Sequence, residues 1–374
     1  MKIVHITDVH PRHDARILKR QAVSLAEAGH DVILVTGDGL KDEVYKGVRI
    51  TSYSDHAMTK IERLKLMFFK RDYLKYLLSF DADIYQFHDF EIIEVGKALK
   101  KKGKHVIFDS HENWLDIIPD QYSKTFIGRG LFKLFLPFYY RRVVSKFDAV
   151  FSVSPNMVET LKKYNPNSYM VSNFPSVKGF SVNPASEKSN YFVYQGVVYK
   201  SSNQEECVKA ISNMKEDVRY KIIGKITDEL REKVKSLDVN NRVEIIGWIE
   251  KAELDSIMDK SICGIVILNY VPTCCGKEGQ LGSNKIFEYM LCGLPVICTD
   301  FVLWKKMIID KYKCGICVEP GNVEQIQAAM EWVVSHPHEA VAMGARGRDA
   351  VLKEFNWEVE LPIYLSYYQA IVSN

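Results

Sequence analysis

Residues 282–297, GSNKIFEYMLCGLPVI, form the most informative stretch of the chain. Ser283 or Asn284 is placed to cap a helix, Gly293 ends that helix, and the apolar run Pro295–Thr299 follows it. The stretch therefore predicts a helix that leads directly into a buried strand.

Two charged side chains on this helix suggest an anion site. Lys285 lies in the first turn, where a positive charge opposes the helix dipole unless an anion neutralises both. Glu288 follows three residues later on the same face, and its carboxylate can accept hydrogen bonds from ribose hydroxyls. The pattern fits a bound nucleotide. The simpler alternative is an ion pair between the two residues on a solvated helix start.

Short apolar runs alternate with amphipathic stretches of helical length on both sides of a Pro/Ser/Asn-rich linker, Ser172–Asn190. Before the linker, the predicted strands are Lys2–Thr7, Asp31–Thr36, Ile84–Phe87, His105–Asp109 and Ala149–Val153, and the predicted helices are Asp14–Ala28 and Glu91–Lys102. After the linker, the predicted strands are Tyr191–Gln195, Arg219–Ile223, Arg242–Ile246, Gly264–Leu268 and Pro295–Thr299. The predicted helices there are Gln204–Met214, Asp228–Leu237, Lys251–Met258, Ser283–Leu291 and Val323–Ser335. We therefore expect an α/β protein with two Rossmann-like, doubly wound parallel-sheet domains, each binding ligands at the carboxyl ends of its strands.

Length and charge agree with two soluble domains. The 374 residues exceed one ordinary core, and 47% hydrophobic with 26% charged residues excludes a disordered or fibrous chain. A net charge of +3 does not suggest nucleic-acid binding. The opening MKIVHIT lacks the features of a secretory signal, and no apolar run is long enough to cross a bilayer. We expect a cytoplasmic protein.

The eight cysteines all lie from Cys207 onward. In a reducing compartment they are expected to be free apolar core residues rather than disulfides. A zinc site from Cys314 and Cys317 with Cys274 and Cys275 is the alternative, although the second pair does not have the CxxC spacing.

The stretch 282–297 resembles the signature of glycosyltransferase family 4, retaining enzymes of the two-domain GT-B fold, in the subgroup with the motif Asn-Lys-x-Phe-Glu-Tyr-Met-x-x-Gly-x-Pro-Val. Other segments resemble motifs of the same subgroup: His10-Pro11 with Asp14-Ala-Arg-Ile, Asp109-Ser-His111-Glu112, Asn173-Phe-Pro175 and Asn356-Trp-Glu. The resemblance implies an acceptor-side domain over residues 1–175, a nucleotide-sugar domain over 190–356 and a C-terminal helix over 357–374 that packs back on the first domain. It also implies that the two domains face each other across a cleft.

The resemblance also implies roles for particular residues. His111 would lie near the transferred sugar and Glu112 would orient its loop, with a capping or core histidine as the alternative for His111. Glu288 would bind the donor ribose and residues 283–285 the diphosphate, whereas the loop 247–249 would contact the base. The expected donor-binding residues are Gly196, Lys200, Gly247, Trp248, Ile249, Gln280, Gly282, Ser283, Asn284, Lys285 and Glu288.

Two positions depart from the family pattern. The usual Glu-x7-Glu pair has Gln280 in its first place, and Glu278 is the nearby carboxylate that could act in its stead as a catalytic residue. The family's basic clamp after the first strand of the nucleotide domain is also missing, because Ser202 stands at the basic position and Lys200 alone supplies charge.

The acceptor side is expected to involve a basic, aromatic segment between Gln121 and Phe147 that has no acidic residue. Its cations are Lys124, Arg129, Lys133, Arg141, Arg142 and Lys146, interleaved with Phe132, Leu134, Phe135, Leu136, Phe138, Tyr139 and Tyr140. Such a segment suits an anionic membrane surface, and a core helix with a solvated basic face is the alternative. The segments Lys65–Arg71 and Tyr73–Leu78 are a second candidate. Near the first strand, Arg12, His13, Asp14 and Arg16 could meet an acceptor, although Asp14 could equally cap a helix.

The predicted function is therefore that of a metal-independent, retaining glycosyltransferase without a cofactor. It would move a sugar from a UDP- or GDP-linked donor to a glycan, expected to be lipid-linked, in cell-surface polysaccharide assembly. Peripheral contact with the inner face of the cell membrane would follow, and no nucleic acid is expected as a partner. The alternatives are a non-catalytic GT-B subunit that binds a nucleotide or a partner, and a nucleotide-sugar epimerase of the same fold.

Overall fold

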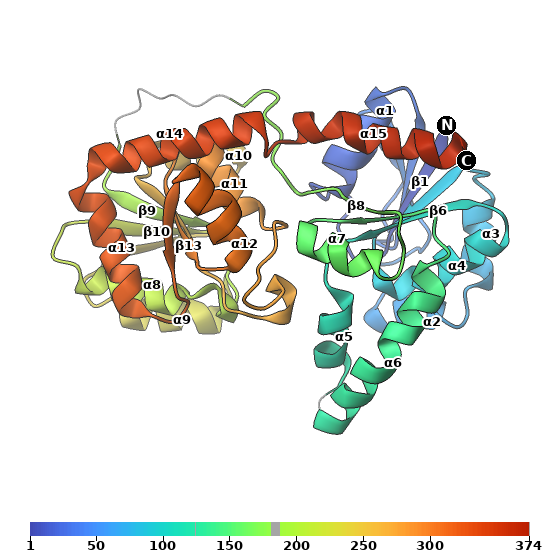
Figure 1. Cartoon of the computed structure of the whole chain (residues 1–374), viewed down its shortest axis with the longest axis horizontal. Helices are drawn as coiled ribbons and strands as arrows, with labels where there is room; N and C mark the ends of the chain where they lie inside the picture. The colour runs from blue at the N-terminus through green and yellow to red at the C-terminus, as the bar shows by residue number, and fades with distance from the viewer. Residues whose placement is uncertain (124, 181–187, 374) are drawn as a thin grey trace. The chain divides into compact units, whose positions relative to one another are not determined.

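The structure is a computed structural model that describes residues 1–123, 125–180 and 188–373 (Figure 1). The chain divides into two compact units. Unit 1 comprises Met1–Asn173 and Glu360–Asn374, and unit 2 comprises Phe174–Val359. Of the predicted linker Ser172–Asn190, residues 181–187 lie outside the described residues.

Unit 1 contains an eight-stranded sheet with the order β3-β4-β2-β1-β5-β6-β7-β8. Every neighbouring pair is parallel except β3 with β4. The strands are β1 (Lys2–Thr7), β2 (Asp31–Thr36), β3 (Glu43–Tyr45), β4 (Val48–Ser52), β5 (Ile84–Phe87), β6 (His105–Ser110), β7 (Ala149–Ser152) and β8 (Ser168–Met170). Their near-continuous apolar runs are buried, as expected for a parallel sheet covered on both faces.

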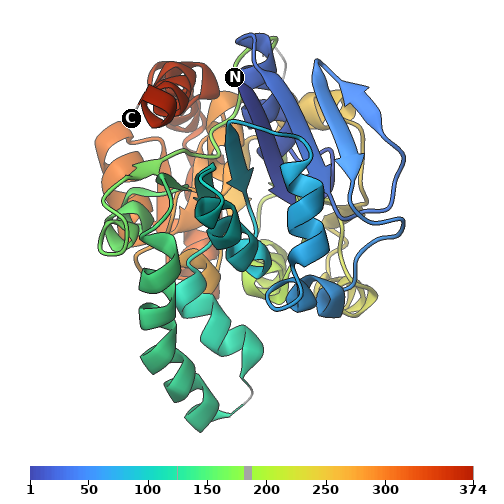
Figure 2. The same cartoon turned by 90° about the vertical axis from the view of Figure 1, so that its right-hand side faces the viewer.

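The helical elements of unit 1 are η1 (Ile17–Ala22), α1 (Val23–Glu27), α2 (Lys60–Leu66), α3 (Arg71–Leu78), η2 (Phe90–Ile92), α4 (Ile93–Lys101), α5 (Trp114–Tyr122), α6 (Phe126–Val144), α7 (Pro155–Lys162) and α15 (Trp357–Ser373). The helix predicted from Asp14 begins three residues later as the π-helical turn η1, because the Asp14 carboxylate accepts the backbone N–H groups of Arg16 and Ile17. Helices α5 and α6 form a hairpin that projects away from the sheet of unit 1 (Figure 2).

Unit 2 contains a six-stranded, all-parallel sheet with the order β11-β10-β9-β12-β13-β14. Its strands are β9 (Tyr191–Gln195), β10 (Arg219–Ile223), β11 (Val243–Ile246), β12 (Cys263–Val266), β13 (Val296–Thr299) and β14 (Gly315–Val318). Its helical elements are η3 (Lys200–Ser202), α8 (Gln204–Asn213), α9 (Asp228–Leu237), α10 (Lys251–Lys260), η4 (Pro272–Cys274), α11 (Asn284–Leu291), α12 (Val302–Trp304), η5 (Lys305–Asp310), α13 (Val323–Ser335) and α14 (Pro337–Lys353). The stretch 282–297 thus forms α11 followed by β13.

None of the eight cysteines forms a disulfide bond in the described structure, and six of them are buried. Burial raises the pKa of the Cys207 thiol to about 12, so such groups behave as small apolar side chains. The zinc grouping of Cys314, Cys317, Cys274 and Cys275 is not formed: Cys317 instead faces Cys298 on the neighbouring strand, with 4.0 Å between the sulfur atoms. Within the described ranges, no helix is long and apolar enough to span a membrane.

Candidate active site

Helix α11 lies close against the sheet of unit 2 because β12 carries a glycine beneath it. A Cβ atom on Gly264 would lie 2.3 Å from Cγ of Tyr289 on α11. The Tyr289 hydroxyl accepts a hydrogen bond from the backbone N–H of Gln195 at 2.9 Å, at the end of β9. This packing places the first turn of α11 at the carboxyl end of the central strand, where parallel α/β sheets bind ligands.

Lys285 extends from the first turn of α11 across the turn that follows β9. A Cβ atom on Gly196 would lie 2.6 Å from Cε of Lys285, so only glycine leaves room for this side chain. The ammonium group lies 5.6 Å from the ring centroid of Tyr194. Burial lowers the pKa of Lys285, and the charge of Glu288 offsets part of this effect. Among the described residues, no carboxylate lies within ion-pair distance of its ammonium group, and the resulting excess of positive charge favours an anion.

Glu288 is fixed one turn further along α11. The side-chain amide of Gln195 donates a short hydrogen bond to one Glu288 oxygen. Gln195, Gly196, Lys285 and Glu288 therefore converge at the end of β9, as a nucleotide site requires. Ser283 is the N-cap residue of α11, and its hydroxyl makes no capping hydrogen bond.

The loop before α11 is held through its main chain. The backbone N–H groups of Val302 and Leu303 donate to the carbonyl oxygens of Lys277 and Glu278 at 3.1 and 3.0 Å. The side-chain oxygen of Gln280 accepts from the backbone N–H of Gly282. Glu278 is exposed on this fixed loop, whereas the Gln280 amide folds back on it.

The remaining predicted donor residues follow β9 itself and β11. Lys200 is exposed in η3, after β9, and Trp248 is exposed in the loop after β11, between Gly247 and the half-buried Ile249. Ser202 is fully buried and its hydroxyl donates to the carbonyl of Tyr199 at 2.6 Å. The chain therefore presents no charge at the position of the family clamp.

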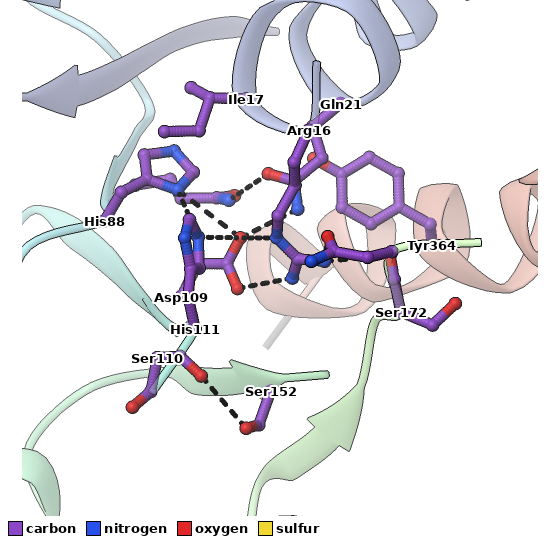
Figure 3. Close-up of polar contacts among 12 residues, drawn as sticks. Arg16, Ile17, Gln21, His88, Asp109, Ser110, His111, Ser152, Ser172 and Tyr364 are labelled. Carbon is purple, nitrogen blue, oxygen red and sulfur yellow. Dashed lines mark hydrogen bonds and ion pairs between the residues drawn. The ribbon is translucent and has the colours of Figure 1, made fainter. Parts of the chain in front are cut away.

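In unit 1, Asp109 is the last residue but one of β6 and lies at the centre of a buried polar cluster (Figure 3). Its two oxygens accept from Arg16 at 2.6 Å (Nη2) and 3.1 Å (Nε), and Oδ2 also accepts from Gln21 at 2.7 Å. On the other side, Nε2 of His111 lies 3.2 Å from Oδ2 of Asp109 and 3.2 Å from Nδ1 of His88, which is itself 3.4 Å from Oδ2. Four nitrogen-bearing side chains thus surround one carboxylate.

The Asp109 carboxylate influences the protonation of these histidines. Burial alone would raise the pKa of Asp109, but Arg16 and His111 hold it well below its usual range. Burial lowers the pKa of His111 to about 4, against the opposing effect of Asp109. His111 is therefore neutral at neutral pH, with Nε2–H donating to Asp109 and Nδ1 left as an acceptor. His88 in turn lies 3.1 Å from His5, through Nε2 and Nδ1 respectively.

His88, Asp109 and His111 also place three potential metal-ligand atoms within 4.8 Å of one another. The donor set does not suit a metal ion, however. Arg16 and Gln21 already bond both Asp109 oxygens, and the guanidinium would repel a cation. The cluster is better described as a hydrogen-bonded relay that orients His111.

Comparisons with known proteins place the chain in a family. Residues 178–350 match the family described as Glycosyl transferases group 1, and residues 15–173 match Glycosyltransferase Family 4. The chain belongs to glycosyltransferase family 4. The predicted fold class is confirmed, because the two parallel-sheet units have the GT-B fold, and the chain is a glycosyltransferase.

Solved structures with low sequence identity share this fold. Sucrose-phosphate synthase from Thermosynechococcus elongatus superposes with a TM-score of 0.78 at 17% identity, covering 100% of this chain and 99% of that one. A glycosyltransferase from Rickettsia africae superposes with a TM-score of 0.72 at 15% identity, covering 100% of this chain and 99% of that one. Anabaena Alr3699/HepE in complex with UDP and glucose superposes with a TM-score of 0.74 at 12% identity, covering 99% of this chain and 100% of that one. No curated protein sequence matched the chain.

Two of the four predicted acceptor residues of this glycosyltransferase are buried. Arg16 lies in the Asp109 cluster. Arg12 is buried as well, with Nε and Nη2 bonded to Asp38 at 2.7 and 2.8 Å. Neither guanidinium is available to a sugar without breaking these pairs. Asp14 takes the capping alternative, which leaves His13, exposed and paired with Glu43 at 3.0 Å, as the accessible member of the four.

Sequence reasoning missed other polar groups beside His111. His10 lies with its ring centroid 5.1 Å from that of His111, and its Nε2 is 3.4 Å from Oδ1 of Asp89. Burial raises the pKa of Asp8 to about 7, and it does the same for Glu112, the residue predicted to orient this loop. The signal was present, because Asp8 and His10 follow β1 and Asp89 follows β5, and β5 lies between β1 and β6 in the sheet.

Proposed function

We propose that this glycosyltransferase uses a nucleoside-diphosphate sugar, with uridine or guanosine as the nucleoside, and retains the configuration of the transferred sugar without a metal ion. The observation that carries the proposal is the convergence of Lys285, Glu288 and Gly196 at the end of β9. The similarity to a protein whose structure holds UDP and glucose supports the choice of donor class.

In unit 2, the free oxygen of Glu288 would accept from ribose hydroxyls while Lys285 and the first turn of α11 neutralise the diphosphate. Trp248, exposed in the loop 247–249, offers a flat apolar face to the base. Gln280 and Glu278 would meet the sugar hydroxyls, and Lys200 would add charge at the phosphates. Lys225, exposed directly after β10, lies beside this turn because its carbonyl accepts from Val198 N at 2.8 Å, and it could supply further charge.

In unit 1, the neutral His111 would accept a hydrogen bond from a sugar hydroxyl through Nδ1, held in that tautomer by Asp109. The acceptor would be a glycan carried on a lipid, as in the assembly of cell-surface polysaccharide. The basic, apolar helix α6 supports a lipid-linked rather than a free sugar as acceptor, with the enzyme peripheral to the membrane.

Titration calorimetry with UDP and GDP, followed by product analysis with common UDP- and GDP-sugars, tests the donor assignment. Glu288→Gln should weaken binding of the preferred nucleotide by about tenfold, because one charge-assisted hydrogen bond to ribose is worth roughly 1.5 kcal/mol. Glu253→Gln, at an exposed site on α10, is the matched control. Equal affinities for both variants and the parent would overturn the assignment.

Product analysis also separates the alternatives. Binding of nucleotide without turnover in the presence of glycan acceptors would indicate a non-catalytic subunit, which the buried Ser202 and the folded-back Gln280 would explain. Conversion of the donor without any acceptor would indicate an epimerase.

A further inference from the structure

Helix α6 carries two apolar faces, and one of them is exposed. Leu136, Tyr140, Val143 and Val144 are buried in the core of unit 1. Five other large side chains are between 53% and 76% exposed, and we call them the outer stripe: Ile127, Leu131, Leu134, Phe135 and Phe138. Their i, i+4, i+7, i+8, i+11 spacing places them on one side of the helix, opposite the core-facing side.

An apolar stripe at this spacing normally faces a protein core. Here it spans roughly 17 Å of helix at the usual rise per residue. Phe126, at the start of α6, adds a ring that is 92% exposed. A continuous exposed surface of this kind marks an interaction site rather than scattered surface residues. The sequence-based alternative, a core helix with a solvated basic face, describes the part of α6 that contains Leu136, Tyr140, Val143 and Val144, but not the outer stripe.

The charges around the outer stripe have one sign. Helix α6 contains no acidic residue, and Arg129, Lys133, Arg141 and Arg142 are exposed along it. Arg129 lies 3.6 Å from Asp120 of α5, which neutralises it in part. Of the two other proposed cations of this segment, Lys146 is exposed just after α6, and Lys124 lies outside the described residues. Leu136 and Tyr140, expected in the same surface, are instead core residues.

A second apolar segment lies beside α6. Phe68 and Phe69, just after α2, are nearly four-fifths exposed. Glu94 connects this segment to α6, because its carboxylate lies 3.8 Å from Lys70 Nζ and accepts from the Tyr139 hydroxyl at 3.0 Å. The Tyr73–Leu78 part of the second candidate does not contribute in the same way, since its Tyr73 and Leu77 are buried.

We propose that the outer stripe and the Phe68–Phe69 segment form a docking surface for a bilayer that contains anionic phospholipid. The apolar side chains would enter the boundary between headgroups and acyl chains, with α6 parallel to the membrane, and the exposed Lys and Arg side chains would contact lipid phosphates. A second copy of the chain is a poorer occupant, because a two-fold interface would bring like charges of the two helices together. The inference deepens the proposed lipid-linked acceptor, but it does not require a particular donor.

Co-sedimentation with lipid vesicles tests this surface. The full chain should bind vesicles of phosphatidylglycerol mixed with phosphatidylcholine, bind pure phosphatidylcholine more weakly, and dissociate as salt is raised. Leu134→Ser should weaken binding by about tenfold, since it removes a buried apolar side chain. Leu40→Ser is the matched control, because the two leucines are 57% and 58% exposed. Arg142→Glu, four residues after Phe138 on the side of the outer stripe, should weaken binding by at least about fivefold, against Lys209→Glu on α8 as control.

Several results would overturn the proposal. These are a parent protein that stays in the supernatant with anionic vesicles, equal losses for Leu134→Ser and Leu40→Ser, and a parent dimer that Leu134→Ser converts to monomer without any vesicle binding. Light scattering after size-exclusion chromatography identifies the last case. Calorimetry with UDP and GDP on the same variants keeps the two proposals separable, because Leu134→Ser should leave nucleotide affinity unchanged.

Discussion

Lys285 is held where both its burial and the positive end of α11 disfavour its charge. A side chain kept in such a place without a ligand costs stability that binding can recover. We therefore predict that Lys285→Met raises the free energy of unfolding of the ligand-free protein by about 0.5 kcal/mol and weakens UDP or GDP binding by at least about tenfold. Urea unfolding and calorimetry measure the two effects, with the exposed Lys209→Met as control. A variant that loses both stability and affinity would contradict this account.

Glu112 provides a prediction about pH. Burial raises its pKa to about 7, so the folded protein retains a proton that the unfolded chain releases near pH 4.5. Between these values the native state binds more protons, and Glu112 therefore lowers stability as pH rises through this window. Glu112→Gln should have almost the parent stability at about pH 4.5 and exceed it by about 1–3 kcal/mol at about pH 8. Urea unfolding at both pH values measures this, and a difference independent of pH would exclude it.

The pKa values of two buried histidines shift in the opposite direction. Burial lowers the pKa of His5 well below its ordinary range and the pKa of His111 from near 6.5 to about 4, so within that pH window the unfolded chain takes up protons that the folded protein does not. Their contribution to stability is lost as pH falls through this window. Comparing Glu112→Gln with its parent cancels this effect, because both proteins keep the histidines.

Single residues also show which features of the site can be predicted from the sequence and which cannot. Lys285 and Glu288 could be paired from their spacing, because one helix turn fixes their separation. The positions of Arg12 and Arg16 could not be derived in this way. Their partners, Asp38 and Asp109, are 26 and 93 residues away in sequence, and only the folded sheet brings them together.

At the scale of elements, the position of α11 depends on the missing side chain at Gly264. Gly264→Ala would place a Cβ 2.3 Å from the Tyr289 ring and push α11 away from β12. We predict a loss of about 2–3 kcal/mol in the free energy of unfolding, as for overpacked cores, together with weaker nucleotide binding because Lys285 and Glu288 move with the helix. Gly130→Ala is the control, since a Cβ there meets nothing within 4 Å. Unchanged nucleotide affinity in Gly264→Ala would show that α11 does not position the site.

Buried, apolar elements were the most predictable. Strands β1, β2, β5, β9 and β10 have the predicted bounds, because each is a buried run flanked by clear breaks. Strands β3, β4, β8 and β14 were not predicted, and β3 and β8 have only three residues each, which carry too little periodicity. The basic, aromatic composition of α6 was recognised from the sequence. Which of its apolar residues face the core could not be predicted, because this depends on the hairpin with α5, and the local sequence pattern does not encode that hairpin.

At the scale of the whole molecule, hydrogen bonds connect the last helix to the centre of unit 1. The Tyr368 hydroxyl on α15 donates a short hydrogen bond to Gln86 on β5. The Gln86 amide donates to Gln21 at 2.9 Å, and Gln21 donates to Asp109, the carboxylate that orients His111. A chain of buried hydrogen bonds thus connects the C-terminal helix with the proposed catalytic histidine.

This connection predicts that Tyr368→Phe acts on one unit only. Loss of the hydroxyl leaves the buried oxygen of Gln86 without its donor, which should cost about 1–3 kcal/mol. Hydrogen exchange should therefore accelerate in β5 and β6 but not in β12 and β13 of unit 2. Tyr367→Phe is the matched control on the same helix, because the half-buried Tyr367 ring stacks on Tyr169 at a centroid distance of 4.3 Å and this contact is retained. Equal acceleration in both units would mean that α15 stabilises the chain generally rather than through the network that ends at His111.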